Sequence, residues 1–192
     1  MSKQPSILAF SGSTRRGSFN DLLVRVAARE AQTYDVSVTM IRLCDFSLPL
    51  YNADLEAEHG IPDAGLELKK LMQSHQGFLI ASPEYNSSLS AVLKNSIDWA
   101  SRREEGEARL SCFDAKVVGL LSAAPGKLGG LRGLTHLRSI LSSMGCLVIP
   151  EQMALAIAHL AFDDQGQLKD EAMQHGVAAV AAGVAELLKK LY

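Results

Sequence analysis

The feature that most constrains the fold of this chain is a regular alternation of short apolar runs with segments of helical spacing. Each run is followed by apolar residues that recur every three or four positions, most clearly over residues 177–191. Five such units in succession predict a parallel sheet with helices on both of its faces. The runs, interpreted as strands, are Ile7–Phe10, Val36–Met40, Phe78–Ala81, Val117–Leu121 and Cys146–Ile149.

The order of the strands follows from how apolar each run is. The first, third and fourth runs are nearly continuous, as expected of strands buried on both faces, whereas the second alternates and belongs at an edge. The order 2-1-3-4-5 of a doubly wound α/β sheet satisfies this pattern. Residues 43–63 contain Pro49, Gly60 and Pro62 and are expected to form a long loop. No linker divides the sequence, so residues 1–192 are expected to form a single domain.

Composition narrows the class of protein. The net charge of −2, from 19 Lys and Arg against 21 Asp and Glu, does not favour a nucleic-acid partner. The most apolar stretch, residues 176–185, is too short to cross a membrane, and the first residues lack the pattern of a signal peptide. Three scattered cysteines (Cys44, Cys112 and Cys146) are typical of a reducing compartment, and we expect packed thiols rather than nucleophiles. These observations predict a cytoplasmic protein with no membrane or nucleic-acid partner.

The predicted sheet also indicates where a ligand would bind. In doubly wound sheets, ligands lie beyond the carboxyl ends of the strands, at the point where the strand order switches. In the order 2-1-3-4-5 this point lies between the first and third strands. The segments that follow strands 1, 3 and 4 are residues 11–20, 82–88 and 122–130. We therefore expect these three segments to form the functional site.

The first segment has the composition of a phosphate site. Gly12 and Gly17 allow tight turns that expose backbone N–H groups, and several Ser and Thr hydroxyls lie between and beside them. Arg15 offers a bidentate guanidinium, and a helix beginning near Phe19 adds free N–H groups at its N-terminus. A plain connection with Ser18 as the helix cap is the alternative interpretation. Both the P-loop lysine and the GxGxxG pattern are missing, which disfavours an NTPase and a dinucleotide site.

The second segment suits a planar ring. Pro83 and Tyr85 offer flat apolar contacts, and the backbone around Glu84 presents several N–H groups in a row. A heteroaromatic ring with carbonyl and ring-nitrogen acceptors would match these groups. An ordinary turn before a helix, capped by Ser88 or Ser90, is an equally good interpretation of this segment alone.

Several motifs together carry a family resemblance. Residues 12–20 (GSTRRGSFN) and 82–86 (SPEYN), with residues 93–99 (LKNSIDW), 48–52 (LPLYN) and the glycine pair 129–130, resemble the NADPH-dependent FMN reductase family. This family includes chromate and quinone reductases, azoreductases and arsenical-resistance flavoproteins. The resemblance implies a flavodoxin-like fold that holds FMN noncovalently, with NADPH or NADH as the electron donor. It also implies a small-molecule acceptor (a quinone, free flavin, metal oxyanion or azo compound) and assembly as a homodimer or homotetramer.

The resemblance assigns roles to residues of the three segments. It implies that the phosphate is held by Ser11, Ser13, Arg15, Ser18, Phe19 and Asn20. It implies that the isoalloxazine is held, largely through the backbone, by Pro83, Glu84, Tyr85 and Asn86, with Ser122 as a further flavin contact. The flavin carries the hydride chemistry, so no catalytic side chain and no metal ligand is expected. Thr14 departs from the family, whose members often have Leu there.

Two further classes of flavoprotein stay open at this point. A flavodoxin-type electron carrier would bind the same cofactor, but it usually presents an acidic docking face, and the first segment here carries two arginines. A redox-sensing flavoprotein is the other alternative.

Three residues outside these assignments carry further expectations. Arg16, if it does not bind FMN, would be free to bind the phosphates of NADPH. Tyr51 is expected either at the substrate mouth or packed on the surface, and Trp99 either in the core or near the ring.

Overall fold

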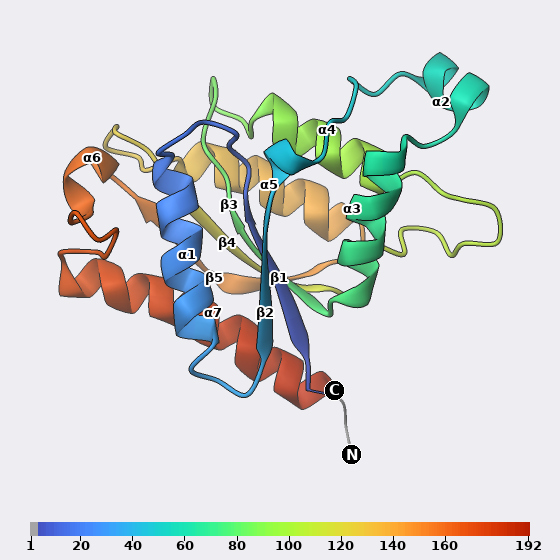
Figure 1. Ribbon diagram of the computed structural model, residues 1–192. Helices are drawn as coiled ribbons and strands as arrows, with labels where there is room; N and C mark the ends of the chain where they lie inside the picture. Colours follow the sequence, from blue (N-terminus) through green and yellow to red (C-terminus); the bar gives the residue numbers. More distant parts are fainter. Residues whose placement is uncertain (1–3) are drawn as a thin grey trace.

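The computed structural model describes residues 4–192 as a five-stranded parallel sheet between two layers of helices (Figure 1). The strand order is β2-β1-β3-β4-β5, and every neighbouring pair is parallel. The predicted order and the edge position of the second strand are therefore confirmed. The strands are β1 (Ser6–Ser11), β2 (Ser37–Arg42), β3 (Gly77–Ala81), β4 (Val117–Ala123) and β5 (Leu147–Leu155).

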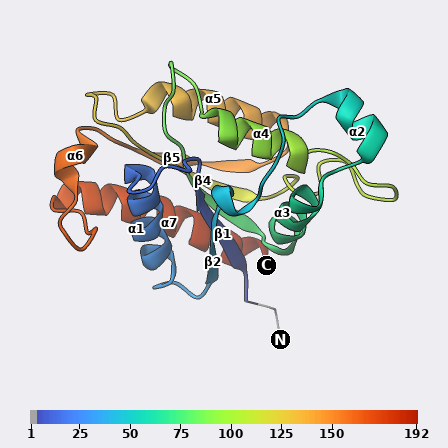
Figure 2. The same cartoon turned by 45° about the horizontal axis from the view of Figure 1, so that its top comes forward.

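The longer helices divide between the two faces of the sheet (Figures 1 and 2). On one face lie α1 (Phe19–Ala31) and α7 (Glu171–Leu191). On the other face lie α3 (Asp63–Ser74), α4 (Ala91–Ala100) and α5 (Leu131–Ser143). Two short helices, α2 (Ala53–His59) and α6 (Ala158–Ala161), lie in connections. Among residues 4–192, no helix combines the length and the hydropathy that crossing a membrane requires.

The central strands are apolar throughout because each supplies two cores. In β1, Ile7 and Ala9 pack toward α1 and α7, whereas Leu8 and Phe10 pack toward α3 and α4. Alternation along a strand sends successive side chains to opposite faces, so both sets must be apolar. The all-buried β3 and β4 repeat this pattern, while β2 is only partly buried, as an edge strand should be.

The prediction of a continuous loop over residues 43–63 is wrong in two places. Residues Leu43–Asp45 form a 3₁₀ turn, and α2 begins after Asn52, whose side chain accepts a hydrogen bond from the Asp54 N–H at 2.8 Å. None of the residues of α2 is buried, so the helix has no apolar stripe that its sequence could show. Cys44 lies on the 3₁₀ turn and is exposed, which corrects the expectation that it is packed.

The fifth strand is longer than its sequence predicts. The prediction ended it at Ile149, before Pro150, but β5 continues through the proline to Leu155. Proline lacks an N–H group and is tolerated at the edge of a sheet, where one side of the strand has no partner. The pairing of β4 with β5 shifts register between Val118 and Leu120, which is where this irregularity is absorbed.

A buried ion pair anchors the long connection between α4 and β4. Lys69 on α3 and Glu107 in the connection have side chains that are 2% and 13% exposed, with Nζ 2.7 Å from Oε2. Lys69 also donates to the Arg102 carbonyl oxygen, and Glu107 accepts from Ser111 Oγ and from the Glu104 N–H. Burial alone would raise the pKa of the Glu107 carboxyl, but these hydrogen bonds and the Lys69 charge lower it to about 2.

This pair predicts a specific loss of stability in acid. Because the folded-state pKa of Glu107 lies below its ordinary value of 4.5, its contribution is present above pH 4.5 and lost as the pH falls toward 2. Replacing Glu107 with Ala leaves Lys69 buried without its counter-charge, so the free energy of unfolding should fall by about 3–5 kcal/mol at pH 7. Urea denaturation between pH 7 and pH 2.5 measures both effects.

The exposed pair of Lys94 and Asp98 on α4 supplies the matched control. Its side chains are 47% and 34% exposed, so D98N should change the free energy of unfolding by only about 0–1 kcal/mol. An E107A variant as stable as D98N at pH 7 would show that the buried pair does not anchor the connection.

Candidate functional site

The carboxyl ends of β1, β3 and β4 bring three loops around one cavity of about 390 Å³. Of the eleven residues predicted for the site, Ser13, Arg15, Ser18, Phe19, Asn20, Pro83, Glu84 and Tyr85 line this cavity. Ser11, Asn86 and Ser122 are outside its lining. Ala123, Ala124 and Pro125 complete the lining and belong to the segment 122–130, which the sequence placed at the site without assigning roles to these three residues.

The loop after β1 exposes a row of backbone donors. Ser18 caps α1, with its Oγ accepting from the Asn20 N–H at 3.3 Å, and Gly17 has a positive φ of 65° that turns the chain into the helix. Within residues 4–192, the N–H groups of residues 16–19 have no hydrogen-bond acceptor. Free N–H groups at the start of a helix favour an anion. This arrangement fits a phosphate group.

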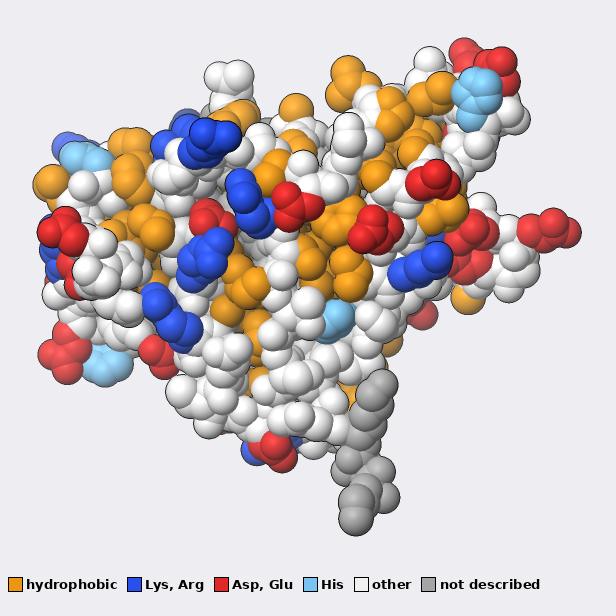
Figure 3. All heavy atoms as spheres, viewed as in Figure 1, with side chains coloured by type: hydrophobic (Ala, Val, Ile, Leu, Met, Phe, Trp, Pro, Cys, Tyr) orange, Lys and Arg blue, Asp and Glu red, His pale blue; other side chains and the backbone are white. Residues whose placement is uncertain are grey.

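Arg15 stands beside these donors. Its guanidinium carbon lies 5.5 Å from the centre of the Phe19 ring, and Phe19 in turn stacks on Phe162 at 6.4 Å with nearly parallel rings. One guanidinium nitrogen donates to the Arg16 carbonyl oxygen at 3.3 Å, which leaves the other N–H groups for a ligand. Lys and Arg side chains gather over α1 and the loop before it (Figure 3), so the surroundings of this loop are basic.

The Asn20 side chain links the start of α1 to the end of β4 by two hydrogen bonds. It is buried, donates to the Ala123 carbonyl oxygen and accepts from the Ala123 N–H, both at 2.9 Å. The amide is thus engaged at both ends with the end of β4. Ser11 is also buried, and its Oγ accepts from the Ser13 N–H at 3.2 Å. The buried side chains of Asn20 and Ser11 thus hold the first loop in place by hydrogen bonds, while Arg15 remains exposed.

The loop after β3 makes a tight turn at the rim of the cavity. Asn86 and Ser87 have positive φ angles of 49° and 67°, and the turn is closed by two backbone hydrogen bonds between Tyr85 and Ser88. The side chain of Tyr85 is 55% exposed and available for a flat contact. Among the described residues, the N–H groups of Glu84 and Asn86 have no acceptor. The helix cap is Ser90, and not Ser88.

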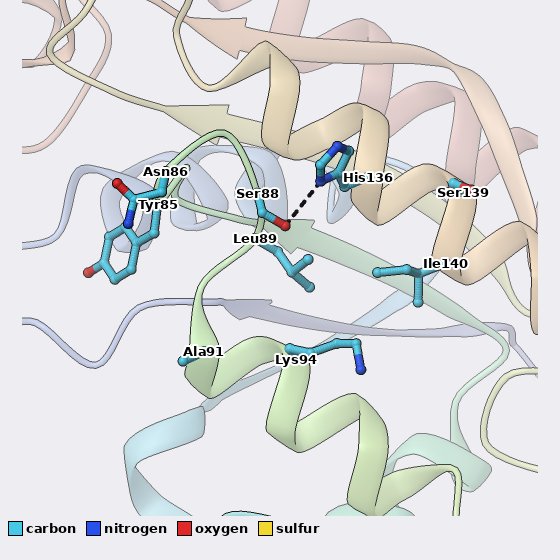
Figure 4. A pocket seen from close by; sticks show the side chains of 9 residues that line it. All are labelled: Tyr85, Asn86, Ser88, Leu89, Ala91, Lys94, His136, Ser139 and Ile140. Carbon is cyan, nitrogen blue, oxygen red and sulfur yellow. Dashed lines mark hydrogen bonds between the residues drawn. The ribbon is translucent and has the colours of Figure 1, made fainter.

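A second, larger groove adjoins the cavity between α4 and α5 (Figure 4). It has a volume of about 690 Å³ and shares Tyr85 with the cavity, and Asn86 belongs to its lining. Ser88 Oγ lies 3.1 Å from His136 Nδ1 at the turn. Tyr51 and Trp99 line neither space, because they pack edge to face at 5.1 Å and Trp99 is fully buried, donating to the Pro49 carbonyl oxygen.

Ser122 and a glycine pair define the end of β4. Ser122 is fully buried, and its Oγ has no hydrogen-bond partner among residues 4–192. A Cβ atom at Gly130 would lie 1.9 Å from this oxygen, and Gly130 also has a positive φ of 91°. A Cβ atom at Gly129 would meet the Ala154 backbone at 2.6 Å. The two glycines therefore let α5 begin directly against the site.

Glu84 points its carboxylate at the start of α5. The carboxylate accepts from the Arg132 guanidinium and from the backbone N–H groups of Arg132 and Gly133. Burial alone would raise the pKa of the Glu84 carboxyl, but these hydrogen bonds and the charge of Arg132 lower it. Arg132 lies just beyond the segment 122–130, and no spacing in the sequence signals its contact with residue 84.

A cavity at the switch point of a doubly wound sheet, with a phosphate loop and an exposed aromatic turn, defines a flavin-type nucleotide site. A profile of the NADPH-dependent FMN reductase family matches residues 5–160. An NAD(P)H-dependent FMN reductase of Pseudomonas aeruginosa is 38% identical over 174 residues, covering 89% of this chain and 88% of the relative. A quinone reductase of Escherichia coli K12 is 31% identical over 173 residues, covering 89% and 88%.

Solved structures agree with the sequence relatives. The flavoenzyme NAD(P)H:(acceptor) oxidoreductase FerB of Paracoccus denitrificans superposes with a TM-score of 0.81 and 25% identity, over 97% of this chain and 98% of that one. The chain belongs to the NADPH-dependent FMN reductase family. The expectations of a flavodoxin-like fold and of an oxidoreductase of this family, with FMN as cofactor and NAD(P)H as donor, are confirmed.

The glycine pair yields a prediction about the site. In G130A, the new methyl group meets Ser122 Oγ in a left-handed backbone conformation, so the free energy of unfolding should fall by about 2–5 kcal/mol. FMN affinity should fall with it, because α5 can no longer begin against the site. Thermal unfolding and FMN titration of the variant measure the two effects.

Gly126 in the same loop is the control, because a Cβ atom there meets nothing within 4 Å and its φ is not positive. G126A should stay within about 0.5 kcal/mol of the wild type. Equal stability of G130A and G126A would contradict the close packing described for the end of β4.

Proposed function

We propose that this chain is an NAD(P)H-dependent reductase of quinones and similar small acceptors, with FMN in the cavity between the three loops. The observation that carries the proposal is the cavity itself, whose lining brings Arg15 and the start of α1, with the free N–H groups of Ser18 and Phe19, to the same space as Tyr85. When bound, FMN supplies the redox chemistry, accepting a hydride from the nicotinamide and passing electrons to the acceptor. The quinone reductases among the relatives support this acceptor class.

The residues of the chain bind and orient the reactants. The N–H groups of residues 16–19, the hydroxyls of Ser13 and Ser18 and the guanidinium of Arg15 would hold the phosphate. The free N–H groups of Glu84 and Asn86 would meet the acceptor atoms of the ring, and Pro83 and Tyr85 would pack on it. Ser122, expected as a further flavin contact, is fully buried and outside the cavity lining, so no contact with the ring is assigned to its unpartnered hydroxyl. No side chain of the cavity is required to transfer a proton.

The charge around the phosphate loop favours a reductase over an electron carrier. A carrier docks on proteins through an acidic face, whereas positive side chains gather around the phosphate loop (Figure 3). Arg16 is exposed beside the cavity and would attract the phosphates of NADPH. A redox-sensing role would not require turnover, so steady NAD(P)H oxidation separates it from the proposed enzyme.

We further propose that residues 1–192 act as one FMN-binding domain, that the chain assembles as a homodimer or homotetramer, and that it works in the cytoplasm. The family resemblance supports the assembly. The three free thiols, one of them exposed, support a reducing compartment.

The proposed function predicts ping-pong kinetics with a soluble benzoquinone. If donor and acceptor use the same open face of the cavity, each must leave before the other binds, so double-reciprocal plots at several quinone concentrations should be parallel. Steady-state NADPH oxidation by the FMN-loaded protein measures this. Turnover with a protein acceptor, and none with quinones, free flavin, chromate or azo dyes, would identify a carrier instead.

Replacing Arg15 with Ala should weaken FMN binding far more than it slows turnover. One charged hydrogen bond to phosphate contributes about 1.5–3 kcal/mol, so the dissociation constant should rise roughly 10- to 150-fold. R15K should fall between Ala and the wild type, because it keeps the charge and loses the planar fork. Titration of apo-protein with FMN, followed by flavin fluorescence, gives the affinities.

R25A is the matched control, since Arg25 carries the same charge on α1 but pairs with Asp21 in solvent. It should bind FMN within about twofold of the wild type. An R15A variant with wild-type FMN affinity and a raised Michaelis constant for NADPH would assign Arg15 to the donor and contradict the phosphate site.

A further inference from the structure

The carboxylate of Glu84 is fully occupied by protein groups. One oxygen accepts from Arg132 Nε at 2.8 Å and from Arg132 Nη2 at 2.5 Å. The other accepts from the backbone N–H groups of Arg132 at 3.0 Å and Gly133 at 3.1 Å. The Glu84 side chain is 9% exposed, whereas that of Arg132 is 58% exposed. With both oxygens bound in this way, the carboxylate is held by protein groups and is not left free for proton transfer in the cavity.

Glu84 also supplies the cap that α5 lacks. Gly130 precedes the helix and offers no side chain, and the first turn of α5 has no acidic residue. A carboxylate at a helix N-terminus satisfies free N–H groups and faces the positive end of the helix dipole. Gly133 makes the approach possible, because a Cβ atom there would lie 3.2 Å from the Ser88 carbonyl oxygen and 3.4 Å from Glu84 Cβ.

The loop that carries Glu84 needs such an attachment. Asn86 and Ser87 both have positive φ angles; Asn tolerates this conformation better than most residues, but at Ser87 it costs energy that the surroundings must offset. The turn presents the unpaired N–H groups of Glu84 and Asn86 and the exposed ring of Tyr85. A loop that orients three groups toward one ligand must keep its shape when that ligand is absent, since ordering it on binding would reduce affinity.

We propose that Glu84 is a positioning residue, whose clamp to Arg132 and to the N-terminus of α5 fixes the loop after β3 in the conformation that receives the flavin ring. This inference rests on the proposed function, because it assigns the ring to that loop. It couples two loops that are 48 residues apart in sequence, so that the affinity for FMN depends on a side chain that the ring does not need to touch.

A double-mutant cycle on the FMN-binding protein tests the clamp. E84Q removes the negative charge with little change of shape, and R132M removes its partner at an exposed position where folding is not at risk. Each single variant should raise the dissociation constant for FMN about 10- to 100-fold. The double variant E84Q/R132M should be no weaker than the weaker single variant, because both changes break one interaction. R132K should recover part of the affinity.

Two readouts separate positioning from a general loss of stability. The visible spectrum of FMN bound to E84Q at saturation should differ from that of the wild type, because the ring environment has changed. The affinity for FMN should fall together with this spectral change, so the effect lies in binding. D98N, which breaks an exposed pair on α4, should leave both the spectrum and the affinity unchanged.

Three results would overturn the inference. The first is wild-type FMN affinity in both E84Q and R132M, and the second is an effect in the double variant equal to the product of the single effects. The third is a loss in R132M alone, which would mean that Arg132 contacts the ligand itself. In each of these cases the wild-type apo-protein still takes up FMN, whereas a wild type that binds no FMN would refute the proposed function as well.

Discussion

Burial of both faces of the parallel sheet is the constraint on which the rest of this structure depends. The side chains of β1 alternate between a core under α1 and α7 and a core under the opposite helices, so neither face is free to bind a ligand. Chemistry is therefore confined to the ends of the strands, where backbone groups leave the sheet unpaired. The change of direction between β1 and β3 opens that end, and the cavity forms there.

Hydrogen bonds between loops turn this opening into a defined site. Asn20 joins the start of α1 to the end of β4, Ser90 Oγ donates to the Gly12 carbonyl oxygen, and Glu84 joins the loop after β3 to α5. Each bond uses a polar side chain to satisfy backbone groups that no strand or helix can satisfy. What remains unpaired, the N–H groups of residues 16–19 and of the turn, is what a phosphate and a ring with acceptor atoms require.

The sheet is well predicted from the sequence, because strands that are buried on both faces must consist of nearly continuous apolar residues. The sequence also predicts the loops of the site, since these must follow the strands. It does not predict α2, which buries no residue, nor the passage of β5 through Pro150, which is permitted only by its place at the edge. The contact between Glu84 and Arg132 cannot be predicted from the sequence either, because it depends on how two loops meet in space and not on any local spacing.

The most direct test of the account is an anaerobic reduction of the reconstituted protein. Apo-protein is loaded with FMN under argon, NADPH is added, and the visible flavin absorbance is followed, with FMN and NADPH alone as the reference. If the cavity holds FMN and NADPH reduces it there, the protein should bind FMN stoichiometrically and bleach much faster than the reference, and the colour should return when a quinone is admitted. A protein that binds FMN without accelerating its reduction, or that binds no FMN, would contradict the proposed function.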